Sequence, residues 1–300
     1  MPHDARFTVH PHPTNPRLRH ITLDNEAISG FLQDVAAINT QELEYVPFSR
    51  FFLAHKLQSQ AGGGFAETLR AIVQDRTSGG FTVNVQGQTD SLDDYVKFAT
   101  AITHLIGIPN FDAMSGNYYA RFTVKHTDTS DSYLRQAYRL FTLHTDGTFA
   151  DEPTDWLIMM KLEERNAVGG ESRLLHLDDW EQLSTYLNHP LAFKQLAYKS
   201  PPSKNVSQSV ERTTFYIQHR LPCICFIDQF AYPKTIEEAL YLRSLSESME
   251  ASQSVRELAL PAGELIMLNN NFWLHGRAPF QQHNELYREL MRIRGVFADV

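Results

Sequence analysis

The sequence predicts a mainly β fold, a jelly roll with flanking helices. Helical spacing of apolar residues dominates before about residue 110, and short apolar or alternating runs dominate after about residue 115. Helices do not alternate regularly with these runs, so a parallel βαβ sheet fits less well than a jelly-roll sandwich. The expected strands are 118–125, 139–143, 156–162, 172–177, 214–217, 223–227, 264–268 and 288–297.

The expected helices lie mostly in the first third of the chain. Ser91 stands where it can cap one of them, with Asp94 in the capping-box position. Residues 1–20 carry four prolines and are expected to be an extended, solvated segment that includes His12. Apolar residues recur at helical spacing in 27–36, 65–74, 91–106, 179–187 and 236–249.

Composition fits a single folded domain over residues 1–300, with 1–110 as mostly helical wrapping and 111–300 as a jelly-roll core with helical insertions. Hydrophobic residues make up 42% of the chain, which is enough for a core. The 27 basic and 35 acidic side chains leave a net charge of −8, which argues against a nucleic-acid partner. No apolar run approaches the ~18 residues of a membrane helix, so no membrane partner is expected.

The cysteines and the first residues bear on location. Cys223 and Cys225 are one residue apart, so on a strand they share a face about 7 Å apart, which suits a disulfide poorly. Both are expected to pack as small core hydrophobes. The first residues also lack the apolar stretch of a secretory signal. We therefore expect a cytoplasmic protein.

His-x-Asp is the first pattern that indicates a metal site. Two ligands separated by one residue lie on the same face of a strand, so both can reach one ion. The sequence contains three such pairs, where chance predicts about 0.7 from its composition. His144 and Asp146 end an apolar run and precede Gly147, which indicates a turn at the mouth of the jelly roll. This pair is the preferred candidate.

The other two pairs favour structural roles. His126 and Asp128 lie in the polar stretch KHTDTSDS, which is typical of a solvated turn. His176 precedes a helical pattern for which Asp178 is the expected N-cap, and capping would occupy that carboxylate.

A third ligand and a row of arginines come from the end of the chain. His275 follows an apolar run, and two histidines with one carboxylate form the facial triad of non-haem Fe(II) oxygenases. On the last expected strand, alternation puts Arg288, Arg292 and Arg294 on one face. Such side chains could clamp a carboxylate in an active site, or they could face solvent from an edge strand.

Several blocks resemble a known family. HTDGTF, GGES, WLHGR and RIRG resemble the Fe(II)/2-oxoglutarate-dependent oxygenases of the taurine-dioxygenase and clavaminate-synthase type. NFDAMSGNYYARF, SDSYLRQ, LLHLDDWE, PPSKNVS, IDQF and NFWLHGR resemble the carbon-starvation-induced (CsiD) glutarate 2-hydroxylase family over roughly residues 110–297. The resemblance implies a double-stranded β-helix, a homotetramer and a role in lysine degradation. It also implies hydroxylation of glutarate at C2 with 2-oxoglutarate and O₂, which yields 2-hydroxyglutarate, succinate and CO₂.

The resemblance also implies roles for single residues. His144, Asp146 and His275 match the iron ligands, and Arg294 matches the arginine that holds the far carboxylate of 2-oxoglutarate. Ser172, in GGES, matches a hydroxyl that assists at that carboxylate in related oxygenases.

The substrate's carboxylates need cationic partners, because an unpaired buried charge is costly. Arg292 is the first candidate, because it shares the expected strand face of Arg294. Further candidates come from the expected strand 118–125, namely Arg121, Tyr118 and Tyr119. Three alternatives stay open. These are the same class of enzyme acting on another small carboxylic acid, a non-catalytic jelly roll that senses 2-oxoglutarate or a dicarboxylate, and a zinc-dependent cupin-like isomerase or hydrolase.

Overall fold

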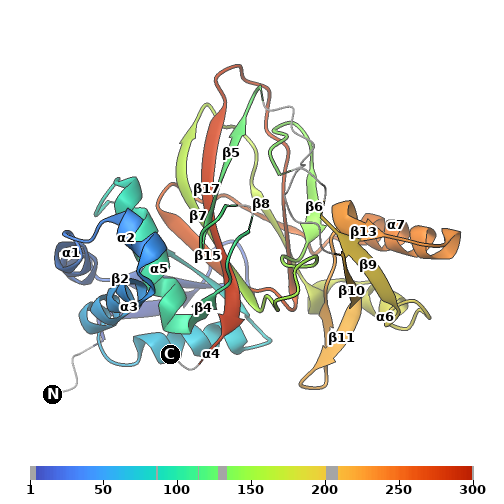
Figure 1. Ribbon diagram of the computed structural model, residues 1–300, viewed down its shortest axis with the longest axis horizontal. Coiled ribbons are helices and arrows are strands. Elements are labelled where there is room, and N and C mark those ends of the chain that lie inside the picture. Colours follow the sequence, from blue (N-terminus) through green and yellow to red (C-terminus); the bar gives the residue numbers. More distant parts are fainter. Residues whose placement is uncertain (1–4, 86, 114, 128–133, 201–208, 299–300) are drawn as a thin grey trace.

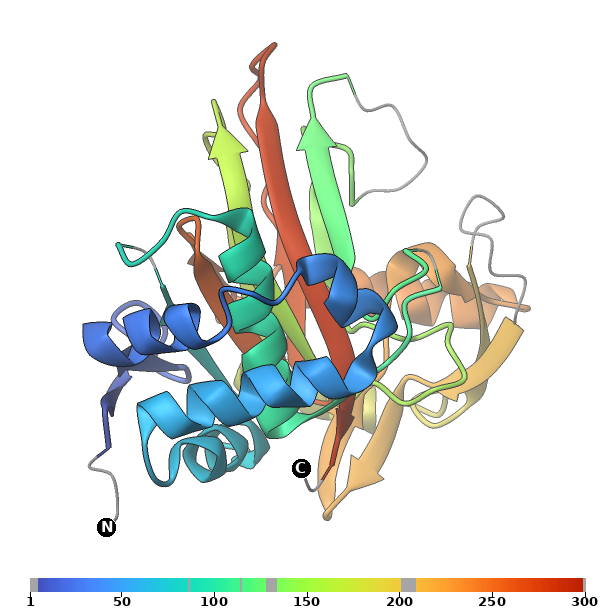
Figure 2. The ribbon, with the colours of Figure 1, turned by 60° about the vertical axis from the view of Figure 1, so that its left-hand side comes forward.

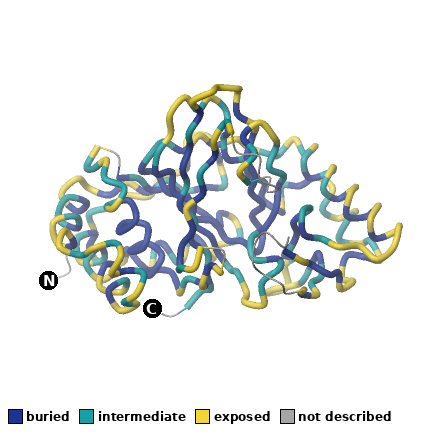
Figure 3. Tube along the Cα trace, turned by 45° about the horizontal axis from the view of Figure 1, so that its top comes forward, coloured by how far each residue is buried: buried dark blue, intermediate teal, exposed yellow. Residues whose placement is uncertain are grey.

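The computed structural model describes residues 5–85, 87–113, 115–127, 134–200 and 209–298. Two β-sheets occupy the middle of the molecule, with helices at both ends of its long axis (Figure 1). The strands of the middle are largely buried, and exposed residues gather on loops and outer helices (Figure 3). The block PPSKNVS and Asp128 fall outside the described residues.

The larger sheet forms one wall of the jelly roll. Its strands pair in the order β1-β2-β3-β15-β7-β17-β4, and β5 also pairs with β17. All neighbours are antiparallel except β2 and β3. The strands are β1 Phe7–Pro11, β2 Arg19–Leu23, β3 Gly80–Asn84, β4 Gly107–Pro109, β5 Ala120–Lys125, β7 Trp156–Arg165, β15 Glu264–Asn269 and β17 Tyr287–Phe297.

The smaller sheet forms the opposite wall, in the order β14-β8-β16-β6. Side chains of both sheets share one buried cluster, with Leu157 and Ile266 from the larger sheet and Leu143 and Leu174 from the smaller. This is the packing expected of a jelly roll. The strands of the smaller sheet are β6 Phe141–His144, β8 Ser172–His176, β14 Arg256–Leu258 and β16 Trp273–Arg277.

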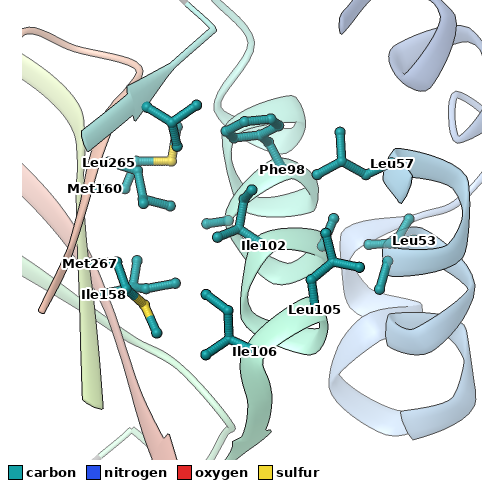
Figure 4. Close-up of a cluster of buried hydrophobic side chains, with 14 of the residues drawn as sticks. Leu53, Leu57, Phe98, Ile102, Leu105, Ile106, Ile158, Met160, Leu265 and Met267 are labelled. Atoms are coloured by element: carbon teal, nitrogen blue, oxygen red, sulfur yellow. The ribbon is translucent and has the colours of Figure 1, made fainter. Parts of the chain in front are cut away.

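A helical layer covers the outer face of the larger sheet, in front of the strands in Figure 2. Ile158 and Met160 of β7 point to this layer and pack with Phe98 and Ile102, as Figure 4 shows. Leu157 and Met159, which alternate with them along the strand, belong to the cluster between the sheets, so β7 is buried on both faces. The helices are α1 Asn25–Asp34, α2 Thr40–Tyr45, α3 Pro47–Ala61, α4 Phe65–Gln74 and α5 Leu92–Ile106.

An insertion packs at the other end of the jelly roll. It contains a three-stranded sheet in the order β10-β9-β13 and a hairpin of β11 and β12. The helix α7 contributes Leu245 and Met249 to the core between the sheets. The elements of the insertion and its flanks are η1 Leu177–Asp179, α6 Leu183–Leu187, β9 Gln195–Lys199, β10 Ser209–Thr213, β11 Phe215–Gln218, β12 Leu221–Ile224, η3 Asp228–Phe230, β13 Ala231–Tyr232 and α7 Ile236–Glu250.

The first residues differ from the expectation at His12. Within 1–20 the described part forms β1 and enters β2. His12 is buried, and its Nδ1 accepts hydrogen bonds from the backbone N–H groups of Thr14 and Asn15. The segment is extended, as expected, and most of β1 is exposed, but the prediction that His12 is solvated is wrong, because its ring packs into the turn whose backbone N–H groups it accepts from.

The pair His176 and Asp178 is structural, as expected, but with exchanged roles. The His176 Nδ1 accepts from the Asp178 backbone N–H and so caps η1. The Asp178 carboxylate instead accepts from both Nε and Nη2 of Arg76, at 2.8 and 2.5 Å. The helix expected at 179–187 is shorter in the structure, where only α6, Leu183–Leu187, is α-helical in this stretch.

Both cysteines have free thiols, as predicted, and Cys223 is buried. Within the part of the chain that the structure describes, no helix has the length and apolar character needed to cross a membrane.

Removal of Phe98 tests the helix–sheet core. Its ring is fully buried between α5 and the sheet, so Phe98→Ala should lower the free energy of unfolding by about 3–5 kcal/mol in urea titrations. Phe193 is 49% exposed, and Phe193→Ala should cost less than about 1 kcal/mol. Equal losses in the two variants would contradict this packing.

Candidate active site

Neighbouring strands bring the predicted ligands together. His144 ends β6 and His275 lies on β16, directly opposite it in the antiparallel register. Their ring centroids are 4.2 Å apart. Asp146 lies in the turn after β6, and its Oδ1 is 3.8 Å from Nε2 of both histidines.

These three residues fit a divalent ion. Their candidate ligand atoms all lie within 4.8 Å of one another, and they are the only such group of three among the described residues. Ligands about 2 Å from a common metal lie roughly 3–3.5 Å apart, so small shifts would close the site. Two imidazoles and one carboxylate on one side of an ion are the donor set of non-haem Fe(II) oxygenases.

Hydrogen bonds behind the ligands fix their orientation. The His144 Nδ1–H donates to the Thr142 carbonyl at 2.7 Å, which leaves Nε2 as the free donor atom for a metal. Asn270 fixes the turn that carries Asp146, because its Oδ1 accepts from the Asp146 backbone N–H and its Nδ2 donates to the Asp146 carbonyl.

Burial and charge set the protonation states that a metal requires. Burial lowers the pKa of His144, and it lowers the pKa of His275 to about 3. Burial would raise the pKa of Asp146, but the nearby positive charges, of which Arg292 contributes most, together outweigh burial and hold that pKa well below its usual range. At neutral pH the site therefore offers two neutral imidazoles and one carboxylate.

A cavity of about 360 Å³ opens over the ligands between the two sheets. Its walls are mostly apolar, but four arginines reach it. Arg288, Arg292 and Arg294 line it together from β17, so the prediction that they share a face is confirmed. The solvated edge-strand alternative is wrong, because β17 lies inside the sheet with β7 on one side and β4 and β5 on the other.

The arginines at the Asp146 end of the pocket are held by polar partners. The Arg292 Nη1 lies 3.0 Å from Asp146 Oδ2, and its Nη2 donates to Asp112 Oδ2 at 2.6 Å. The Arg294 Nη1 donates to the Thr154 hydroxyl at 3.2 Å.

The opposite end of the pocket holds two further arginines, Arg277 and Arg288. Arg277 on β16 lies directly opposite Ser172 on β8, and both line the pocket. Arg277 and Arg288 both lie over the ring of Phe280, at 5.4 and 5.6 Å from its centroid. Ser172 is therefore at the Arg288 end of β17. Arg294 is six residues further along this strand, roughly 20 Å away.

Arg288 is a candidate functional residue that the sequence pattern alone does not single out. Arg288 is only 3% exposed, and its Nε and Nη1 have no hydrogen-bond partner among the described residues. Burial lowers its pKa to about 10. Strand alternation placed it on the pocket face, but nothing in the sequence reveals which arginine keeps free donors.

The structure does not bring Arg121 to the pocket. Its guanidinium forms two hydrogen bonds to Glu289, at 2.8 and 2.9 Å, and its side chain is 41% exposed. Phe122 and Val124, which alternate with it on β5, line the pocket instead. The hydroxyls of Tyr118 and Tyr119 bond to Thr100 and Glu44 in the helical layer.

A family model described as CsiD matches residues 7–297. This chain belongs to the CsiD family. A glutarate 2-hydroxylase of Citrobacter koseri is 45% identical over 298 residues, which cover 98% of this chain and 92% of the relative. The resemblance noted from the sequence is therefore confirmed over nearly the whole length of this CsiD-family protein.

Solved structures support the fold of the CsiD-family chain. An asparagine oxygenase in complex with Fe(II), 2S,3S-3-hydroxyasparagine and succinate has a TM-score of 0.71 and 15% identity, over 90% of this chain and 92% of that one. The non-haem iron oxygenase OrfP with Fe, succinate and (3S)-hydroxy-L-Arg has a TM-score of 0.65 and 16% identity, over 92% and 93%. The predicted double-stranded β-helix of the taurine-dioxygenase type is confirmed.

Replacement of one ligand tests the metal site. His275→Ala should remove tight binding of one Fe(II) per chain, measured by anaerobic titration and metal analysis, because two ligands hold such ions poorly. His126, from another His-x-Asp pair, lies near the surface beside Tyr138, and His126→Ala should bind iron like the parent protein. Unchanged binding in His275→Ala would rule out this site.

Proposed function

We propose that this protein is an Fe(II)/2-oxoglutarate-dependent dioxygenase that hydroxylates glutarate at C2, with release of succinate and CO₂. The observation that carries the proposal is the triad of His144, Asp146 and His275 at a pocket lined by four arginines. The glutarate 2-hydroxylase relative at 45% identity supports the substrate.

The charge inside the pocket matches two dicarboxylates. Among the residues that the structure describes, four arginines and the shielded carboxylates Asp112 and Asp146 leave two positive charges in the pocket. The other two acidic lining residues of this part of the chain, Asp151 and Glu152, are exposed. A ferrous ion raises the sum to four. 2-Oxoglutarate and glutarate together carry four negative charges, so binding both leaves no buried charge unbalanced.

His144, Asp146 and His275 would hold the iron from one side and leave the remaining positions for 2-oxoglutarate and O₂. The bound iron supplies the oxidative chemistry that inserts oxygen into a C–H bond. The chain itself orients the two acids, and apolar walls that include Phe122 and Met159 keep water from the reacting carbon.

The far carboxylate of 2-oxoglutarate is assigned to Arg288 and Ser172, which changes the assignment made from the sequence. Ser172 lies at the Arg288 end of the pocket. Arg288 has donors without a partner among the described residues, and a carboxylate can accept from this guanidinium in a bidentate manner. Arg294 lies at the other end and is bound to Thr154.

The same reasoning assigns glutarate to the Asp146 end. Arg292 lies 4.8 Å from the centroid of the Phe122 ring, so a guanidinium and an apolar surface for methylene groups occur side by side. Arg294, on the same strand face, is the partner for a second carboxylate.

We also propose a cytoplasmic homo-oligomer, a tetramer by resemblance to the family, that acts in lysine degradation. Free thiols at both cysteines support the location. Exposed aromatic side chains on α2 and α3, namely Tyr45, Phe48, Phe51 and Phe52, support a self-association surface.

The activity can be tested directly. Purified protein with Fe(II), ascorbate and 2-oxoglutarate should form succinate and 2-hydroxyglutarate only when glutarate is present, and His144→Ala should abolish both products. Succinate that depends on another acid would keep the class and reject glutarate. Binding of 2-oxoglutarate without turnover would favour a sensor, and activity with zinc in place of iron would favour the cupin-like alternative.

Lysine replacements test the two ends of the pocket. Arg288→Lys should raise the KM for 2-oxoglutarate by about tenfold or more and change the KM for glutarate little, because one ammonium cannot replace a bidentate guanidinium. Arg292→Lys should do the reverse. A large rise in the 2-oxoglutarate KM for Arg294→Lys, with none for Arg288→Lys, would restore the assignment made from the sequence.

A further inference from the structure

An aspartate lines a pocket that we assign to anions. The side chain of Asp112 is only 5% exposed and faces the same cavity as the iron ligands. Its charge opposes both proposed dicarboxylates, so its presence needs a separate explanation. The Asp112 Oδ2 accepts the hydrogen bond from Arg292, and its Oδ1 accepts from the Ser115 backbone N–H at 3.1 Å.

Arg292 bridges Asp112 and an iron ligand. One terminal nitrogen, Nη2, points to Asp112, and the other, Nη1, points to Oδ2 of Asp146. The second oxygen of Asp146, Oδ1, faces the histidines His144 and His275. A row of carboxylate, guanidinium and carboxylate therefore connects the turn after β4 to the metal centre.

The fixed shape of a guanidinium gives this row a consequence. An arginine beside a single carboxylate prefers two parallel hydrogen bonds to both oxygens. In that arrangement Arg292 would compete with a metal for Oδ1 of Asp146. Asp112 holds Nη2 at 2.6 Å on the other side, so only Nη1 reaches Asp146.

We propose that Asp112 is a positioning residue that restricts Arg292 to one oxygen of Asp146, which leaves the other oxygen for iron and keeps the guanidinium within reach of glutarate. The glutarate part rests on the proposed function. The part that concerns the metal rests on the geometry of the three side chains alone.

Asp112→Asn is the first test, because it keeps the shape of the side chain and removes its charge. We expect the affinity for Fe(II), titrated anaerobically without substrates, to fall by about tenfold or more, as for other partners of metal ligands. The KM for glutarate should rise by a similar factor, whereas the KM for 2-oxoglutarate should stay within about twofold.

A double-mutant cycle separates positioning from general support of the turn at Ser115. If Asp112 acts through Arg292, then Asp112→Asn should have no further effect on iron affinity in an Arg292→Met background. The matched control is Glu289→Gln. Glu289 lies on β17, like Arg292, but its ion pair with Arg121 of β5 lies outside the pocket lining, so this variant should bind iron and glutarate like the parent protein.

Parent-like iron affinity in Asp112→Asn would overturn the proposal, and so would a loss that persists in the Arg292→Met background. A thermal melt of each variant identifies a folding defect. The proposal would also be overturned if Asp112→Asn and Glu289→Gln both lost iron affinity in proportion to the fall in their melting temperatures. If the parent protein does not turn over glutarate but Asp112→Asn still loses iron, the proposed substrate is wrong and the positioning role stands.

Discussion

The antiparallel pairing of β6 with β16 is the constraint on which the rest of the site depends. It places His144 opposite His275, although 131 residues separate them in the chain. Neighbouring strands lie about 4.8 Å apart, so two imidazoles on one face can reach a common point. A slip of one residue would turn one imidazole to the other face of the sheet and destroy the site. Asn270 holds Asp146 close to the two histidines through hydrogen bonds to the backbone N–H and carbonyl of Asp146.

The position of β17 inside the larger sheet turns a basic strand into the wall of an anion pocket. At an edge, its arginines would be solvated and weakly interacting. Between β7 on one side and β4 and β5 on the other, they are withdrawn from water, and burial lowers the pKa of Arg288 to about 10. Unpartnered buried donors destabilise a fold unless a ligand completes them, which is why they mark functional positions.

The two ends of the pocket differ in how their arginines are held, and this difference gives each end a task. Within the described part of the chain, Arg288 has donors without a hydrogen-bond partner at the end of the pocket that Ser172 also lines, which suits the binding and release of a carboxylate. Arg292 is already bound between Asp112 and Asp146, so it links the substrate end to the metal ligand. The helical layer on the outer face of the sheet keeps β7 and β17 in place, because α5 packs its apolar side chains against them.

Local patterns were enough to predict the jelly roll, the helices α1, α4 and α5, and the His144 and Asp146 pair, because periodicity and turn residues act over a few positions. They missed α2 and α3, where exposed Phe48 and Phe52 blur the apolar stripe that marks a helix. They also selected Arg121, which Glu289 neutralises from 168 residues away. Which arginine stays free, which meets Asp112 and which histidine lies opposite His144 depend on strand register between distant segments, and only the tertiary structure decides that register.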